Sequence, residues 1–66
     1  MTKTVTGDFG SKAAMANAMD DLLSSGYPRE KVFMDTEHMQ LKVITADVTE
    51  REVHEILMRH KPTGVH

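Results

Sequence analysis

Histidine is the side chain of this sequence best suited to chemistry near neutral pH, and the chain contains four of them. They stand at His38, His54, His60 and His66. A zinc site needs three or four converging ligands, and ligands on one helix are typically three or four residues apart. His54 and His60 are six residues apart, so on one helix they point in different directions. The spacing therefore predicts no metal site.

His60 has the most specific interpretation of the four, because it continues an apolar stripe formed by Val53, Ile56 and Leu57. The structural interpretation places His60 at the C-terminal end of a helix, satisfied by a backbone carbonyl or by the helix dipole. The functional interpretation makes it a ligand-binding, proton-carrying or pH-sensing group. We favour the structural interpretation, because a lone histidine without a partner makes no catalytic pair.

The serines and acids predict no catalytic residue and no bound cofactor. Ser11 stands where it can cap a helix, and because a helix start can also hold an anion, Ser11 is a second candidate ligand residue. The glycines beside it lack the lysine and the spacing of a nucleotide loop. Asp20 and Asp21 are adjacent on a helix, so they splay apart and do not share a proton. We therefore do not expect an enzyme.

Length and charge restrict further the classes of protein to which this chain can belong. A chain of 66 residues forms one domain, which we assign to residues 1–66. The net charge is −2, and basic residues are scattered among acids, so we expect no nucleic-acid binding. No apolar run approaches the roughly 20 residues of a membrane helix, and the first residues are too polar for a signal peptide. With no cysteine in the chain, we expect a cytoplasmic protein without a membrane partner.

Hydrophobic spacing predicts the order of the elements. Strands are expected over 4–9, 32–36 and 41–46, where β-branched or apolar residues cluster. Gly7 in the first strand indicates either a bulge or a close approach of another segment. A helix is expected from Lys12 to Ser25, ended by Gly26. Its apolar stripe consists of Met15, Ala18, Met19 and Leu22.

The second helix carries the clearest local start. Thr49 and Glu52 have the spacing of a capping box, and Val48 and Val53 have that of a hydrophobic staple. Pro62 ends this helix. The remaining residues, 63–66, are too few for a full strand but can pair briefly with an edge.

These elements predict an α+β protein on the ferredoxin-like split β-α-β-β-α plan. We expect a three-stranded antiparallel sheet, with a fourth strand rudimentary or absent and both helices on one face. The first strand is then an exposed edge, which is a template for another chain. We therefore predict a homodimer, formed edge to edge or through the open sheet face, with Phe33, Ile44 and Val5 as interface residues.

The first half of the chain resembles the opening of general-stress-protein 17M-like domains. The resemblance rests on residues 7–11 and on residues 20–32, which end a helix in a Leu-x-x-x-Gly-aromatic step and enter the next strand. Residues 55–60, followed by Gly64 and Val65, are similar to that family's Ile-Leu-x-x-His-Gly-Ala ending. Lys61 departs from the pattern, because the family often has glycine directly after the histidine. The resemblance implies a bacterial, stress-associated protein without a shared catalytic motif.

The leading functional hypothesis is a small, self-associating interaction module, which can also have a further protein partner. A small-ligand-binding or regulatory domain is the first alternative, and an enzyme is the third. An interaction module should form a stable oligomer. A ligand sensor should have a pocket with convergent polar groups, and an enzyme should have titratable residues within hydrogen-bond reach of one another.

Overall fold

Strand β1 (Thr2–Asp8) is the first element of the chain, and its side chains point alternately to the two faces of the sheet. In the computed structural model, which describes residues 1–66, Val5 and Gly7 are buried whereas Thr2 and Thr4 are exposed. The strand expected over 4–9 is confirmed in place, although it starts at Thr2 and ends at Asp8. Phe9 follows the strand and turns its ring into the core.

Three further strands complete an antiparallel sheet: β2 (Val32–Asp35), β3 (Gln40–Ala46) and β4 (Gly64–Val65). The strand order is β2-β3-β1-β4. β1 pairs with β3 along its whole length, from Thr2 opposite Ala46 to Asp8 opposite Gln40. The long β1–β3 ladder is therefore the centre of the sheet, and the two shorter strands form its edges.

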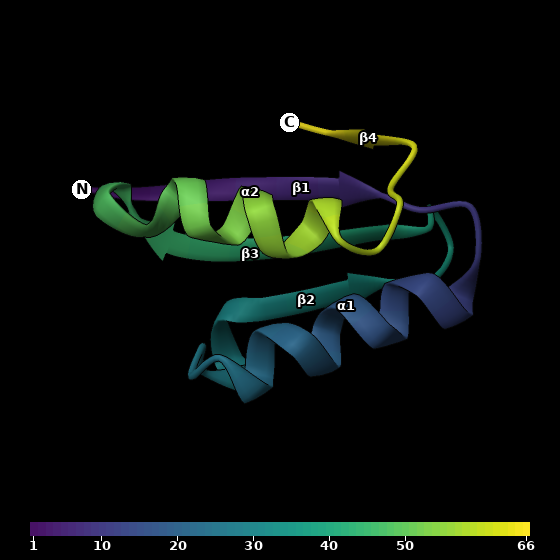
Figure 1. Cartoon of the computed structure of the whole chain (residues 1–66), viewed down its shortest axis with the longest axis horizontal. Helices are drawn as coiled ribbons and strands as arrows, with labels where there is room; N and C mark the ends of the chain where they lie inside the picture. The colour runs from purple at the N-terminus through teal and green to yellow at the C-terminus, as the bar shows by residue number, and fades with distance from the viewer.

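Two helices, α1 (Lys12–Ser24) and α2 (Glu50–Met58), lie side by side on one face of this sheet (Figure 1). Each is joined to the sheet by a single turn of 3₁₀ helix, η1 (Arg29–Lys31) before β2 and η2 (Asp47–Thr49) after β3. The protein is thus a small α+β domain of two layers, as the apolar stripes predict. None of its helices has the length and apolar character needed to span a membrane.

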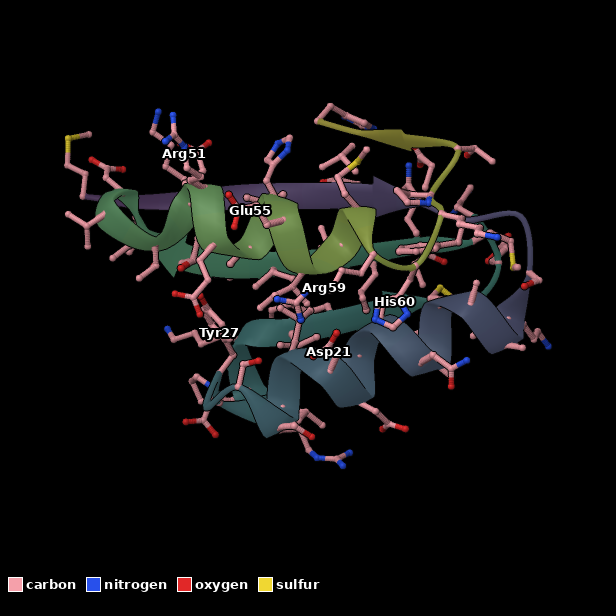
Figure 2. All side chains as sticks on the ribbon, viewed as in Figure 1. Asp21, Tyr27, Arg51, Glu55, Arg59 and His60 are labelled. Carbon is pink, nitrogen blue, oxygen red and sulfur yellow. The ribbon has the colours of Figure 1, made fainter.

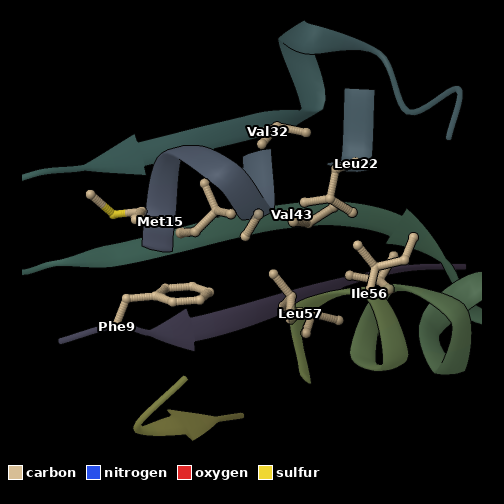
Figure 3. Packing of buried hydrophobic residues seen from close by; sticks show 11 residues of the cluster. Phe9, Met15, Leu22, Val32, Val43, Ile56 and Leu57 are labelled. Atoms are coloured by element: carbon tan, nitrogen blue, oxygen red, sulfur yellow. The ribbon is translucent and has the colours of Figure 1, made fainter. Parts of the chain in front are cut away.

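The hydrophobic core fills the space between the helices and the sheet (Figure 3). It draws on both helix stripes and on the inward side chains of three strands, because each of these surfaces must be removed from water. Its members are Val5, Phe9, Met15, Ala18, Leu22, Val32, Leu41, Val43, Val53, Ile56 and Leu57. The opposite face of the sheet is covered by no other element of the chain.

Gly7 lies where the Phe9 ring and the α2 residue Leu57 pack against β1. A Cβ atom at Gly7 would lie 3.0 Å from Cε2 of Phe9 and 3.4 Å from Cδ1 of Leu57. The pairing of β1 with β3 runs through Gly7 without an extra residue. Of the two interpretations of this glycine, close approach is confirmed and a bulge is wrong.

The fourth strand is present but covers only part of the β1 edge. Gly64 and Val65 pair with Asp8 and Gly7, and His66 exchanges backbone hydrogen bonds of 2.6 and 2.8 Å with Thr6. The expected fourth strand is therefore rudimentary but not absent. The prediction of an exposed β1 edge is correct only for the half from Thr2 to Val5.

The two helix starts differ in how well local sequence predicts them. The Ala14 amide donates to Oγ of Ser11 at 3.2 Å, which confirms the N-cap of α1, and Gly26 has a φ of 100° where that helix ends. The capping box of α2 is wrong, because Thr49 makes no cap bond and its hydroxyl instead bonds to Thr45 and to the Ala46 carbonyl. The staple is also wrong, since η2 turns Val48 outward and leaves it 91% exposed.

Adjacent residues of α2 provide a test of this packing. Leu57 is fully buried and Met58 is 59% exposed. Leu57→Ala should lower the free energy of unfolding by about 2–5 kcal/mol, because it leaves a cavity against Gly7 and Phe9. Met58→Ala should change it by less than about 0.5 kcal/mol. Urea denaturation followed by circular dichroism measures both, and equal effects would contradict the packing described.

Lys61 provides a second test, because its φ of 53° lies in the left-handed region that favours glycine. That conformation costs a lysine roughly 1 kcal/mol. Lys61→Gly should therefore leave the free energy of unfolding unchanged or raise it by up to about 1 kcal/mol, after the entropy of unfolded glycine is counted. Lys61→Val should lower it by about 1–2 kcal/mol. The reverse order in a urea titration would show that Lys61 is not strained.

Candidate functional site

The open face of the sheet carries two of the residues expected at an interface. Val32 and Val43 point into the core, so the alternation of β2 and β3 places Phe33 and Ile44 on the opposite face. Phe33 is 50% exposed and lies opposite Lys42 in the β2–β3 register. Ile44 is two residues along β3 from Lys42, which makes it a diagonal neighbour of Phe33 on that face.

Val5, the third expected interface residue, is placed elsewhere by the structure. Its side chain is 1% exposed and belongs to the core beneath the helices. The alternation of β1 turns the odd-numbered residues toward the helices, so the Val5 side chain is absent from the open face, although its backbone lies on the unpaired half of the β1 edge. What β1 offers to the open face is a row of threonines, Thr2, Thr4 and Thr6.

One end of the open face holds a carboxylate with two side-chain partners. Oδ1 of Asp8 accepts a hydrogen bond from Nε2 of Gln40, and Oδ2 lies 2.9 Å from Nε2 of His66. The bond from Gln40, followed by that with His66, holds the pKa of the Asp8 carboxyl below its usual value. Asp8 therefore remains ionised and ties the chain after β4 to the centre of the sheet.

A second carboxylate, Asp35, lies at the same end of this face. It sits 2.9 Å from Nδ1 of His38 and accepts from the backbone amides of Glu37 and His38. The His38 side chain, and then the backbone bonds, lower the pKa of Asp35. The open face thus has an acidic end, a lysine at its centre and a partly apolar middle formed by Phe33 and Ile44.

His60 is not a lone histidine, because its side chain has a hydrogen-bond partner on the other helix. Its Nε2 lies 2.9 Å from Oδ2 of Asp21, and Nη1 of Arg59 lies 3.3 Å from the same oxygen. Figure 2 shows the three side chains meeting between α1 and α2. The His60 bond and the Arg59 charge lower the pKa of Asp21.

Sequence reasoning missed Asp21 because the two residues are 39 positions apart. Its only sequence mark is its place beside Leu22, at the margin of the α1 stripe. The arrangement is a polar bridge between two helices, in which a carboxylate and not the expected backbone carbonyl is the partner of His60. No group of three or more acidic and histidine side chains is arranged to hold a metal ion.

A shallow hollow of about 230 Å³ lies where the end of α1 faces the start of α2. Its lining residues are Ser25, Gly26, Tyr27, Thr49 and Glu52. The Tyr27 hydroxyl is buried and has no partner at full hydrogen-bonding geometry. Burial, then the charge of Glu52 and its hydrogen bonding to the phenol, raise the pKa of Tyr27, and hydrogen bonding with Thr49 lowers it.

Ser11, by contrast, is exposed, and its hydroxyl is occupied as the cap of α1.

Comparisons with protein-family models, curated proteins and solved structures give no match to this chain. Three places in the structure are candidate sites: the open sheet face, the Asp21–His60 bridge and the hollow at Tyr27.

The Asp21 bridge makes stability depend on pH in a defined direction. Because the pKa of Asp21 is lowered in the folded state, its stabilisation is present above the unfolded value of about 3.9 and is lost as the pH falls through the folded value. Asp21→Asn should be less stable than the parent protein near pH 6, and the difference should narrow toward about pH 3. Urea titrations across this range measure it.

Asp20→Asn is the matched control, because this substitution removes the same charge one residue away, on the exposed side of α1. It should have no comparable pH-dependent effect. A constant difference between Asp21→Asn and the parent at every pH would show that the bridge does not act through the charge of Asp21.

The buried hydroxyl of Tyr27 makes a separate prediction. Tyr27→Phe removes a buried polar group that has no partner at full hydrogen-bonding geometry, so the free energy of unfolding should stay unchanged or rise by up to about 1 kcal/mol. Thr45→Val removes a buried hydroxyl that is bonded to Thr49 and should cost about 1 kcal/mol. Thermal unfolding compares the two variants. A Tyr27→Phe loss as large as that of Thr45→Val would mean that the phenol has a partner.

Proposed function

We propose that this chain is a small protein-interaction module that forms a homodimer through the open face of its sheet. The observation that carries the proposal is Phe33, an aromatic side chain half exposed on a sheet face that no other element covers. Ile44 extends the apolar surface beside it. Burying an aromatic ring of this kind against a second copy would stabilise the pair by removing apolar surface from water.

The fold supports this choice of surface. The strand order β2-β3-β1-β4, with a helix after β1 and another after β3, is the order expected of a ferredoxin-like split βαβ arrangement. We infer that the domain belongs to this class. On that plan, both helices cover one face and the other face is left for a partner.

A second copy is the occupant that best fits the face. A domain of this size buries only about 60% of the surface that its unfolded chain exposes, so covering the sheet adds usefully to a small stability. The face also carries charges of both signs, Lys42 at its centre and Asp8 and Asp35 at one end. Two copies packed by a two-fold axis can therefore place lysine near carboxylate.

The cellular setting is proposed on the resemblance to general-stress-protein 17M-like domains. It implies a bacterial, cytoplasmic protein that acts in a stress response by binding and not by catalysis, either to itself or to a further protein. One structural detail supports the resemblance. Lys61, which stands where that family often has glycine, has the left-handed backbone conformation that glycine favours.

Solution mass tests the proposal directly. Light scattering on a size-exclusion column should give twice the chain mass of 7.4 kDa at protein concentrations of about 10 μM. Phe33→Glu should give the monomer, because it places a charge at the centre of the interface. Met58→Glu is the matched control, since it puts the same charge at an exposed apolar site of α2, and it should remain dimeric.

The outcomes separate the competing arrangements. A parent protein that is monomeric throughout the concentration series would overturn the proposal. A Phe33→Glu protein that stays dimeric would move the interface to the open half of the β1 edge, Thr2 to Val5, where backbone pairing needs no aromatic contact.

A further inference from the structure

We propose that formation of the dimer takes up a proton at His66, so that the two copies bind more tightly as the pH falls from about 8 to about 6. This inference rests on the proposed dimer through the open sheet face, and it concerns the regulation of that same surface. Its structural basis is the pair of His66 and Asp8 at one end of the face, where Nε2 of the imidazole lies 2.9 Å from Oδ2 of the carboxylate.

The open face carries more permanent negative charge than positive charge. Alternation along the strands turns three charged side chains to this face: Asp8 of β1, Asp35 of β2 and Lys42 of β3. In the strand register the two acids lie on either side of Gln40, and Lys42 is two residues along β3 from it. Each copy therefore brings two carboxylates and one ammonium group to the interface.

Covering this face with a second copy makes the excess carboxylate unfavourable. Lys42 takes part in none of the ion pairs within the chain, so its ammonium group is free to meet one carboxylate of the other copy. One carboxylate per copy is then left without a cation. A charge removed from water without a partner is unfavourable, and neighbouring titratable groups respond by changing their protonation. A histidine in contact with that carboxylate can supply the missing positive charge by binding a proton.

Two histidines contact the carboxylates of this face, and the structure favours His66 over His38. Asp35, the partner of His38, stands at the end of β2 and also accepts from two backbone amides of the turn that follows. Those amides already compensate part of its charge. The Asp8 carboxylate accepts from side chains alone, and its strand β1 lies inside the sheet between β3 and β4. The proton is therefore assigned to the pair of His66 and Asp8.

The charges around His66 all come from the strands. It follows β4 and lies opposite Thr6, so its neighbours on the open face are Asp8 on β1, then Lys42 on β3 and Asp35 on β2. The helix α2 packs on the other face of the sheet (Figure 1), which separates its titratable side chains from His66. Those side chains are Glu50, Arg51, Glu52, His54 and Glu55.

Burial of the pair sets the direction of the pH dependence. Bonds from Gln40 and His66 hold the pKa of the Asp8 carboxyl below its usual value, so the change of charge falls on the imidazole. In the single chain the His66 side chain is 65% exposed, and water solvates either of its forms. In the dimer that water is removed, and the protonated form neutralises Asp8. The dimer thus binds the proton more tightly than the monomer does, and association weakens as the pH rises.

The dissociation constant of the dimer tests this proposal when it is measured by sedimentation equilibrium at about pH 8, 7 and 6. It should fall by about tenfold or more from the highest pH to the lowest. His66→Gln should keep the weaker affinity of the parent protein at every pH. His38→Gln, beside Asp35, and His54→Gln, on the helical side, are the matched controls and should keep the pH dependence of the parent.

Asp8→Asn is an independent check, because it removes the excess carboxylate itself. This variant should dimerise at about pH 8 as tightly as the parent protein does at about pH 6, with no further dependence on pH. Its amide oxygen can still accept from Gln40, and circular dichroism checks that the fold is kept.

The outcomes separate this proposal from the dimer on which it rests. A parent protein that dimerises with one dissociation constant at all three pH values would overturn the proton uptake and leave the dimer unaffected. A parent protein that is monomeric at every pH would overturn both. A pH dependence that survives in His66→Gln, or that is lost in His38→Gln, would assign the proton to another group and overturn the role of His66.

Discussion

The contact between α2 and the centre of the sheet determines where the other features of this molecule lie. Leu57 packs against β1 at Gly7, the one glycine of that strand. The Phe9 ring packs against the same glycine. This close packing brings the helix down onto β1 and β3 and sets its position beside α1. The end of α2 then meets the middle of α1, and its start meets the end of α1 (Figure 2). A larger residue at Gly7 would first displace the Phe9 ring, whose Cε2 an added Cβ would meet at 3.0 Å.

Both polar features on the helical side follow from that placement. Where α2 ends, His60 and Arg59 reach Asp21, and the three side chains satisfy one another as an ion-paired bridge. Where α2 starts, the buried Tyr27 hydroxyl lies beside Glu52 and Thr49 without a partner at full hydrogen-bonding geometry. The two ends of the seam between the helices therefore differ, with a carboxylate beside two basic side chains at one end and a shallow hollow at the other.

The open face of the sheet has a different character because both helices lie on the opposite side of the sheet. Two helices are enough to bury one side of four strands, and the other side keeps Phe33 and Ile44 among threonines and charged residues. Such a mixed surface is compatible with water, and covering it would remove the apolar area of Phe33 and Ile44 from water.

The sequence by itself determined the elements whose cause is local. The helix stripes, the alternation of β1, the Ser11 cap, the end of α1 at Gly26 and the rudimentary last strand are all present as expected, because periodicity and capping act within a few residues. The tertiary structure decided the rest. Asp21 and His60 are 39 positions apart, and they meet only because the two helices pack side by side on the sheet. The Thr49 hydroxyl bonds to Thr45 and Ala46, which are near in sequence, because the turn η2 brings the end of β3 beside the start of α2.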